Sequence, residues 1–432
     1  MASTPRTAAA PLGVTRQGRH AIAAATIGNI LEIFDFVAYG IFAIPIAKTF
    51  FPAGSDLVSL ILAFLTFGVG FLARPVGAFV LGAYADRVGR KNALSLTLLL
   101  MALGTLIPAI CPSYASIGIA APIIVVCGRL LQGFSAGGEI GGTVAMLVEN
   151  APPTRRGFYA SFQQMTQGAG ILLAGILGMI LTTVFTQQQV VDGVWRIAFA
   201  FGLLIAPVGW YIRRSVEETP VFEAEKHRHV PVSIGTLLRS YWPGLLAGIG
   251  VMVFWTIATY VSNYLSTYAV RELKLTLMES YAGQLCYGIT TVIACPLVGR
   301  LADRVGPNKP MFFGAGVAAI IAYPLFKILA AQPNVGMLIA VQVVIAILLS
   351  CYAAAASLVL ARIFPTRLRA TGVSLAYAVG VTVFGGFTPM IVTALIGATQ
   401  DKLIVGVYLS VAALISCLTL WLAKRPADTE LD

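Results

Sequence analysis

The sequence predicts an all-α membrane protein of twelve transmembrane helices, arranged as two six-helix halves related by pseudo-two-fold symmetry. Of its 432 residues, 58% are hydrophobic and only 11% are charged, against roughly 25% charged in soluble domains. Apolar stretches of about 20 residues, enough to cross a bilayer, recur along the chain. Two segments, Gly82–Lys91 and Gly299–Lys309, share an Asp-Arg-Val-Gly core whose aspartates lie 217 residues apart. A repeat at half the chain length indicates two similar halves, a pattern typical of secondary transporters.

The apolar stretches are longer than barrel strands and do not alternate, so helices must satisfy their backbone polar groups. The first six candidate spans are residues 21–47, 57–84, 93–111, 116–148, 157–185 and 194–212. The second six are residues 241–270, 279–300, 310–330, 335–364, 371–399 and 403–423. We therefore expect an N-terminal segment (1–20), an N-terminal half (21–213), a polar linker (214–240), a C-terminal half (241–423) and a C-terminal tail (424–432).

The formal net charge of +11 is distributed unevenly across the predicted membrane. Of 29 Lys and Arg residues, 21 fall on the side that holds the N-terminus, the linker and both repeated loops. Only five fall on the other side: Lys48, Arg271, Lys274, Lys327 and Lys402. By the positive-inside rule we expect an inner-membrane protein whose termini, linker and repeated loops are cytoplasmic. This distribution accounts for the basic charge without nucleic acid as a partner.

Several other classes of function are not supported by the sequence. It contains no pattern of a nucleotide-binding loop, a metal site or a catalytic triad, so we expect neither an enzyme nor a cofactor. Its six cysteines occur singly in or beside apolar runs and are expected to be small buried hydrophobes. The N-terminal segment lacks a short apolar region with a cleavage site, so the first span is expected to be retained. We expect a monomer surrounded by lipid.

Five ionisable residues lie deep within the predicted spans: Glu32, Asp35, Arg74, Arg129 and Glu139. A charge at that depth costs several kcal/mol, so it usually faces a partner or an aqueous cavity. The economical arrangement sets Asp35 against Arg129 and leaves Glu32 and Glu139 nearer to Arg74. Because none of the three histidines lies within a span, Asp35, Glu32 and Glu139 are the candidates for carrying a proton. An ion pair that only orders the helices is the alternative.

Four sequence motifs resemble those of a known family. They are the Gly-x-x-x-Asp-Arg-x-Gly-Arg-Lys loop at 82–91 and the segments Gly28–Gly40, Gly70–Gly77 and Gly128–Glu139. Together they resemble the metabolite:proton symporter family of the major facilitator superfamily. Two further stretches, around residues 213–228 and 384–402, look similar to the tricarboxylate carriers, whereas Gly157–Gln163 looks more like a 2-oxoglutarate carrier.

This resemblance implies a proton-coupled symporter that imports a small organic anion by alternating access, a di- or tricarboxylate such as citrate or tricarballylate. It also implies that Asp35 faces Arg129 and couples proton binding to transport. The alternative within carriers is symport of a zwitterion such as proline or betaine, whose cation would engage aromatic side chains. A non-transporting sensor built on a carrier scaffold is a more remote alternative.

Arginine side chains are the expected ligands of a carboxylate substrate, because a guanidinium binds a carboxylate through two parallel hydrogen bonds. Polar residues that share helix faces could complete the cavity. The predicted substrate-binding residues are Arg129, Arg74, Gln163, Gln167, Tyr260, Asn263 and Tyr264. A structural contact is the alternative for Arg74, and an interfacial aromatic belt is the favoured interpretation of Tyr268.

The two repeated loops are expected to brace neighbouring helices in one state of the transport cycle and to release them in another, as in the superfamily. A solvated basic loop would satisfy the charge distribution equally well. The predicted cytoplasmic latch residues are Asp86, Arg87, Gly89, Arg90, Glu149, Asp303 and Arg304.

Overall fold

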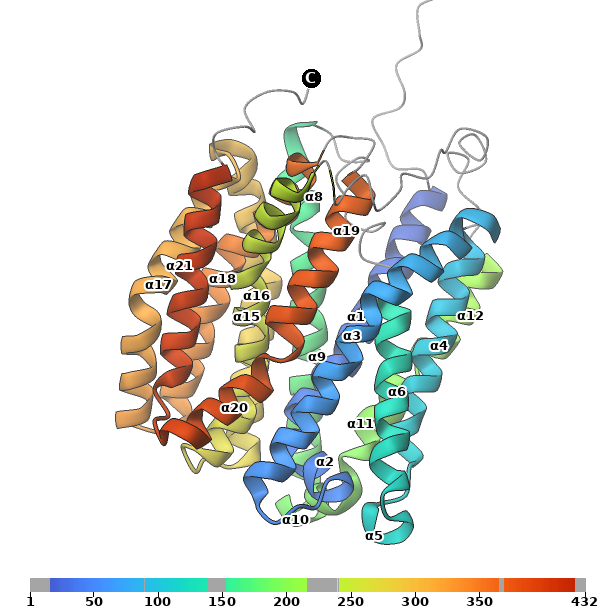
Figure 1. The fold of residues 1–432 in the computed structure, drawn as a ribbon, viewed down its shortest axis with the longest axis vertical. Coiled ribbons are helices and arrows are strands. Elements are labelled where there is room, and N and C mark those ends of the chain that lie inside the picture. Colours follow the sequence, from blue (N-terminus) through green and yellow to red (C-terminus); the bar gives the residue numbers. More distant parts are fainter. Residues whose placement is uncertain are drawn as a thin grey trace, which may run out of the picture.

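The fold was determined from a computed structural model that describes residues 16–88, 90–137, 153–215, 239, 241–364 and 369–423. Two helix bundles stand side by side, the N-terminal one in blue to green and the C-terminal one in yellow to red (Figure 1). The described residues contain eight long apolar helices, two bent helix pairs and two shorter apolar helices. They correspond to the twelve predicted spans, and the predicted all-α fold is confirmed.

The N-terminal bundle is formed by helices α1 to α12. Their bounds are α1 Arg16–Ile41, α2 Ala43–Phe50, α3 Asp56–Val88, α4 Arg90–Ile110, α5 Tyr114–Ile117, α6 Ala120–Ala136, α8 Arg156–Ala160, α9 Phe162–Val184, α10 Gln187–Gln189, α11 Arg196–Gly202 and α12 Ile205–Ser215. A short 3-10 turn, Pro153–Arg155, precedes α8, and a π-helical turn, Val190–Val194, follows α10.

The C-terminal bundle is formed by helices α15 to α21. Their bounds are α15 Trp242–Arg271, α16 Leu277–Val305, α17 Asn308–Ala331, α18 Val335–Ile363, α19 Arg369–Gly380, α20 Thr388–Thr399 and α21 Ile404–Ala423. A π-helical turn, η3 (Val381–Gly386), separates α19 from α20. Helices α9 and α16 pack along one another and join the two bundles.

Two predicted spans are bent and a third contains a π-helical turn, which the sequence analysis did not anticipate. The first bends by 67° between α1 and α2, where Pro45 lacks the N–H that would bond to the carbonyl one turn earlier. The sixth begins earlier than the predicted residue 194: Gln187–Val194 and Arg196–Val208 form a pair bent by 55°, and the backbone leaves helical geometry at Gly193. The eleventh contains η3, directly before Pro389.

Glycines bring α3 and α6 unusually close together. A Cβ atom on Gly133 would collide with the carbonyl oxygen of Gly70, and one on Gly77 would collide with that of Phe134. Small residues at such a crossing let two membrane helices approach backbone to backbone. This contact fixes the relative positions of Arg74 on α3 and Arg129 on α6.

Large apolar side chains cover much of the outer surface of both bundles. Phe79 is 64% exposed, Ile320 is 75% exposed and Trp421 is 57% exposed. Exposed apolar surface of this extent is characteristic of a lipid-facing protein. Together with the apolar spans, it identifies an integral membrane protein.

Candidate functional site

Arg129 and Asp35 lie together in the interior of the N-terminal bundle. Both side chains are only 1% exposed, with Arg129 on α6 and Asp35 on α1. They are close enough to interact electrostatically. However, none of the three guanidinium nitrogens of Arg129 forms a hydrogen bond with any described residue. The expected opposition of the two groups is therefore present, whereas a direct hydrogen-bonded pair is not.

Gln132, a residue that the sequence analysis missed, is a hydrogen-bond partner of Asp35, and the Thr105 hydroxyl lies within hydrogen-bonding reach of the same carboxylate. The Gln132 amide nitrogen Nε2 donates to Asp35 Oδ2 and also to Thr105 Oγ1, at 3.0 Å for the latter. Gln132 follows Arg129 by three residues on α6, so both side chains project from one helix face. That spacing was the available signal in the sequence.

The Arg129 guanidinium is held in place by aromatic rings. Its carbon Cζ lies 3.8 Å from the ring centroid of Tyr39 and 5.9 Å from that of Phe199. The Tyr39 hydroxyl donates to the carbonyl oxygen of Ala63 at 3.1 Å, which fixes the ring. Cation–π contacts compensate part of the cost of burying the charge and leave the N–H donors in the guanidinium plane unused.

Arg74 has a similar aromatic setting on α3. It is 4% exposed, and its Cζ lies 4.3 Å from the ring centroid of Phe71 and 4.6 Å from that of Phe36. Glu32 is also buried. Both Glu32 and Arg74 lie within electrostatic reach of two tyrosines, Tyr260 on α15 and Tyr377 on α19. The site thus contains two buried arginines, each stacked on rings and each with an acidic residue nearby.

Polar side chains of α9 line the boundary between the bundles. Gln163 and Gln167 are both buried, and the side-chain amide oxygen Oε1 of Gln163 has no hydrogen-bond partner among the described residues. Gln164, the residue directly after Gln163, accepts a 2.7 Å hydrogen bond from the indole N–H of Trp255 on α15. This bond connects the two halves, and neither of its residues was among the predicted site residues.

The three predicted residues on α15 lie along the same helix as Trp255. Tyr260 packs edge-to-face on Phe71, with ring centroids 5.5 Å apart, and so adjoins Arg74. Asn263 and Tyr264 are 5% and 1% exposed. The Tyr264 ring packs against Phe64, with centroids 5.7 Å apart, across the boundary between the bundles. The arginines and the α15 side chains are therefore linked through aromatic contacts.

Tyr268 is not part of a lipid-facing aromatic belt. Its side chain is fully buried, and its hydroxyl donates to the carbonyl oxygen of Lys402 at 3.2 Å. The ring packs on Phe326 of α17, with centroids 5.8 Å apart. The interfacial interpretation is wrong, because the hydroxyl binds a loop carbonyl inside the protein.

The second repeated loop contacts the N-terminal bundle directly. The Asp303 carboxylate, near the end of α16, accepts hydrogen bonds from the backbone N–H groups of Gly157, at 2.6 Å, and Phe158, at 3.0 Å. A Cβ atom on Gly157 would approach Asp303 Oδ1 and the carbonyl oxygen of Gly299, so glycine is needed for this contact. The negative charge also lies at the N-terminal end of the span Arg156–Val184, where the helix dipole favours it.

The remaining predicted latch residues take no part in the two Asp303 hydrogen bonds. Arg304 is exposed at the end of α16, while Arg300, one turn earlier, stacks over the ring of Phe158 at 4.9 Å. Gly89, Glu139 and Glu149 lie outside the described residues, as do the side chains of Asp86, Arg87 and Arg90.

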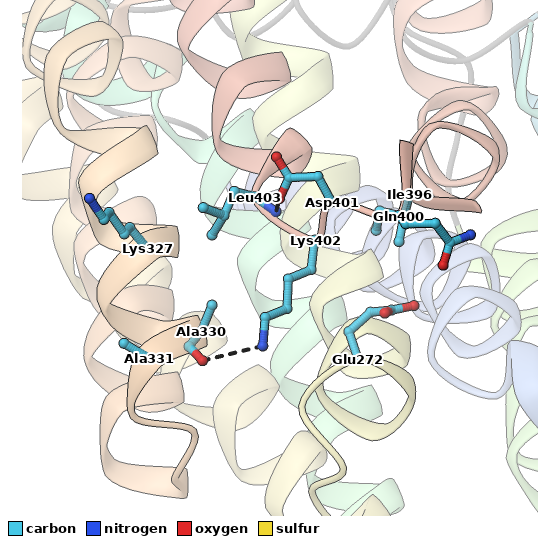
Figure 2. A pocket seen from close by; sticks show the side chains of 9 residues that line it. All are labelled: Glu272, Lys327, Ala330, Ala331, Ile396, Gln400, Asp401, Lys402 and Leu403. Atoms are coloured by element: carbon cyan, nitrogen blue, oxygen red, sulfur yellow. Dashed lines mark hydrogen bonds between the residues drawn. The ribbon is translucent and has the colours of Figure 1, made fainter. Parts of the chain in front are cut away.

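A surface pocket of about 380 Å³ lies between the ends of α15, α17 and α20 (Figure 2). Neither Arg74 nor Arg129 lines it. Its charged lining residues are of both signs: Glu272, Lys327, Asp401 and Lys402. Figure 2 shows the Lys402 amine directed at the carbonyl oxygen of Ala330, 3.3 Å away, in the last turn of α17. Lys402 thus binds a helix C-terminus, a structural role.

The residues that the structure describes contain no group of three or more His, Cys, Asp or Glu side chains placed to hold a metal ion. The six cysteines are free thiols in the structure.

Proteins of similar sequence are transporters. A citrate-proton symporter of Klebsiella pneumoniae is 41% identical over 409 residues, which cover 94% of this chain and 92% of that protein. A proline/betaine transporter of Escherichia coli (strain K12) is 31% identical over 436 residues, which cover 96% of this chain and 85% of that protein.

A solved structure has the same fold. The crystal structure of a D-xylose-proton symporter matches with a TM-score of 0.75 at 16% sequence identity, over 92% of this chain and 96% of the other. The Major Facilitator Superfamily matches residues 25–331 and 284–432 of the sequence. The chain therefore belongs to the Major Facilitator Superfamily.

Proposed function

We propose that this protein is a proton-coupled symporter that imports a small organic anion, a di- or tricarboxylate such as citrate or tricarballylate, by alternating access. The observation that carries this proposal is the Arg129 guanidinium, which is 1% exposed and has three nitrogens without a hydrogen-bond partner among the described residues. Unsatisfied buried donors are costly, and a planar fork of N–H groups matches a carboxylate. The 41% identity to a citrate-proton symporter supports the same substrate class.

The aromatic contacts favour an anion over a zwitterion. A betaine or proline cation would need free aromatic faces. Here the rings of Phe36 and Phe71 stack on Arg74, and the ring of Tyr39 stacks on Arg129. Since the chain's own cations already cover these rings, the site offers positive charge to a ligand rather than negative ring faces.

Within this function, each group of site residues has a proposed role. Asp35 is the proton-coupling carboxylate, supported by Glu32 and Glu139, and Arg129 and Arg74 bind the substrate. Amide and hydroxyl groups from both bundles complete its coordination; these residues are Gln163, Gln167, Tyr260, Asn263 and Tyr264. We place the protein in the inner membrane as a monomer, with the Asp303 end of the bundles and both termini in the cytoplasm, because basic residues concentrate at that end.

Transport in reconstituted liposomes tests this function. Purified protein is expected to accumulate labelled citrate or tricarballylate against its gradient when the outside is acidic, and to lose accumulation when an uncoupler collapses the pH gradient. Labelled 2-oxoglutarate and proline serve as the competing substrates, and protein-free liposomes as the control. Accumulation of proline alone would replace the anion with a zwitterion, and gradient-independent accumulation of citrate would contradict proton coupling.

The Asp303 contact gives a separate prediction about the latch. Asp303→Asn replaces one acceptor oxygen by an NH₂ group and removes the charge, so one of the two N–H bonds is lost and the other is weakened. Charge-assisted hydrogen bonds contribute roughly 1.5–3 kcal/mol each. The maximal uptake rate is expected to fall several-fold while KM changes by less than about twofold.

The control for this prediction is Asp192→Asn, which neutralises an exposed aspartate bonded only to Gln188 in the described chain. Its uptake rate should equal that of the unmodified protein. An unchanged rate in Asp303→Asn would leave the Asp303 contact with a packing role alone.

A further inference from the structure

Building on the proposed function, we infer that Gln132 is a positioning residue: it binds the ionised Asp35 and thereby keeps the Arg129 guanidinium available to the substrate carboxylate. In this arrangement the coupling carboxylate and the substrate-binding arginine do not neutralise one another directly. The amide of Gln132 instead donates to the carboxylate.

The hydrogen bonds around Gln132 fix the orientation of its amide. The Thr105 hydroxyl donates its single hydrogen to the carbonyl oxygen of Met101 at 3.0 Å. Its oxygen therefore faces Gln132 only as an acceptor, and the group that it meets must be the NH₂ end of the amide. The second hydrogen of that NH₂ group is then directed at Asp35 Oδ2. Gln132 thus presents a donor, which suits an ionised carboxylate.

The surrounding helices are shaped to hold this amide. Gln132 is fully buried, and a Cβ atom on Gly104 of α4 would collide with its Cγ. On the other side of the carboxylate, a Cβ atom on Gly202 of α11 would lie 3.2 Å from Asp35 Oδ1. Two glycines therefore make room for Gln132 and Asp35, and neither can be enlarged without displacing one of them.

The charged groups near Asp35 show what would happen without the amide. Helix α6 contributes Arg129, whereas α4 and α11 contribute the uncharged Thr105 and Gly202 at this point. On α1 itself, the nearest acidic residue is Glu32, one turn earlier. Without Gln132, an ionised Asp35 is left with the Thr105 hydroxyl and with Arg129, its one charged partner at this point of the described chain. A direct ion pair would then compete with the substrate for the same guanidinium.

This competition can be measured as a double-mutant cycle in the full-length protein. Gln132→Met keeps the side-chain length but removes both donors, and it is expected to weaken citrate binding about tenfold or more, the equivalent of one charge-assisted hydrogen bond. Combining it with Asp35→Asn removes the competing charge. The double variant is therefore expected to bind citrate within about threefold of Asp35→Asn alone, a recovery that a packing defect would not produce.

Calorimetry with citrate in detergent gives these affinities, with Gln342→Met as the matched control. Gln342 is a fully buried glutamine of α18 that donates to the carbonyl oxygen of Ser262, outside the proposed site. Its replacement should leave the affinity unchanged. Equal losses in Gln132→Met and in the double variant, or no loss in Gln132→Met, would overturn the inference. Absence of citrate binding in the unmodified protein would instead contradict the proposed substrate.

A second measurement needs no substrate and covers a Gln132→Met protein that does not fold. Infrared spectroscopy identifies the Asp35 carboxylate band as the one lost in Asp35→Asn. The band is expected to shift in Gln132→Asn, whose shorter side chain draws the amide away from Asp35, by more than it shifts in Arg129→Ala. A larger shift in Arg129→Ala would show that the arginine holds the carboxylate, and would overturn the inference independently of the transported molecule.

Discussion

Replacing Arg129 with alanine is expected to abolish measurable citrate binding. The guanidinium is buried among aromatic rings, its nitrogens make no bond with a described side chain or backbone group, and it is the positive charge nearest to Asp35. In the proposed complex the charge pair is the Arg129 guanidinium and a citrate carboxylate. Removing one partner of a buried, hydrogen-bonded charge pair costs about 2–5 kcal/mol, which corresponds to a loss of affinity from about 30-fold to several thousand-fold. Calorimetry of the purified variant with citrate measures this loss directly.

Arg129→Lys is the informative companion to this variant. It keeps the positive charge, but an ammonium lacks the planar fork that binds both carboxylate oxygens at once. We expect it to recover only a small part of the affinity that alanine loses. Wild-type affinity in Arg129→Ala would remove Arg129 from the binding site, and full recovery by lysine would reduce its role to that of a point charge.

Asp35→Asn is expected to abolish accumulation of substrate against its gradient while exchange of internal for external substrate continues. An amide can still accept a hydrogen bond from Gln132, so the local packing is retained, but it cannot take up and release a proton at this position. Liposome assays separate the two activities, since accumulation depends on the pH gradient and counterflow does not.

The same assays on Asp192→Asn, an exposed aspartate, control for a general effect of losing a carboxylate. Both activities should be normal in that variant. Concentrative uptake by a well-folded Asp35→Asn protein would exclude Asp35 as the coupling group and return attention to Glu32 and Glu139.

Much of the architecture was predictable because a bilayer restricts the backbone to structures that satisfy their own polar groups. The length and composition of the apolar stretches identified the helices, and the Asp86 and Asp303 repeat identified the two halves. The burial of Asp35 and Arg129 was also predictable, because a charged side chain in the middle of an apolar span is costly to expose to lipid and therefore faces the protein interior. In each case a strong and local physical constraint is visible in the sequence itself.

Other features depend on contacts that no local pattern encodes. Gln132 lies beside Asp35 because α1, α4 and α6 meet there; its spacing from Arg129 places the two on one helix face but does not identify Asp35 as its partner. The bond between Gln164 and Trp255 joins residues 91 positions apart in different bundles. The burial of Tyr268 was missed for the same reason, as its position near a helix end suits both an interfacial and an internal tyrosine.

The Asp303 contact also constrains how the two bundles can vary. Its donors are main-chain N–H groups, which every residue except proline supplies, so a change of side chain at Phe158 leaves the donor in place. The acceptor, by contrast, is a single side chain on α16. No change of side chain on α8 can therefore compensate simply for the loss of the Asp303 carboxylate. Gly157 is restricted for a different reason, because a Cβ atom at this position has no room. Over generations, α8 can change at Phe158 but not at Gly157, while α16 is held to two positions, Gly299 and Asp303.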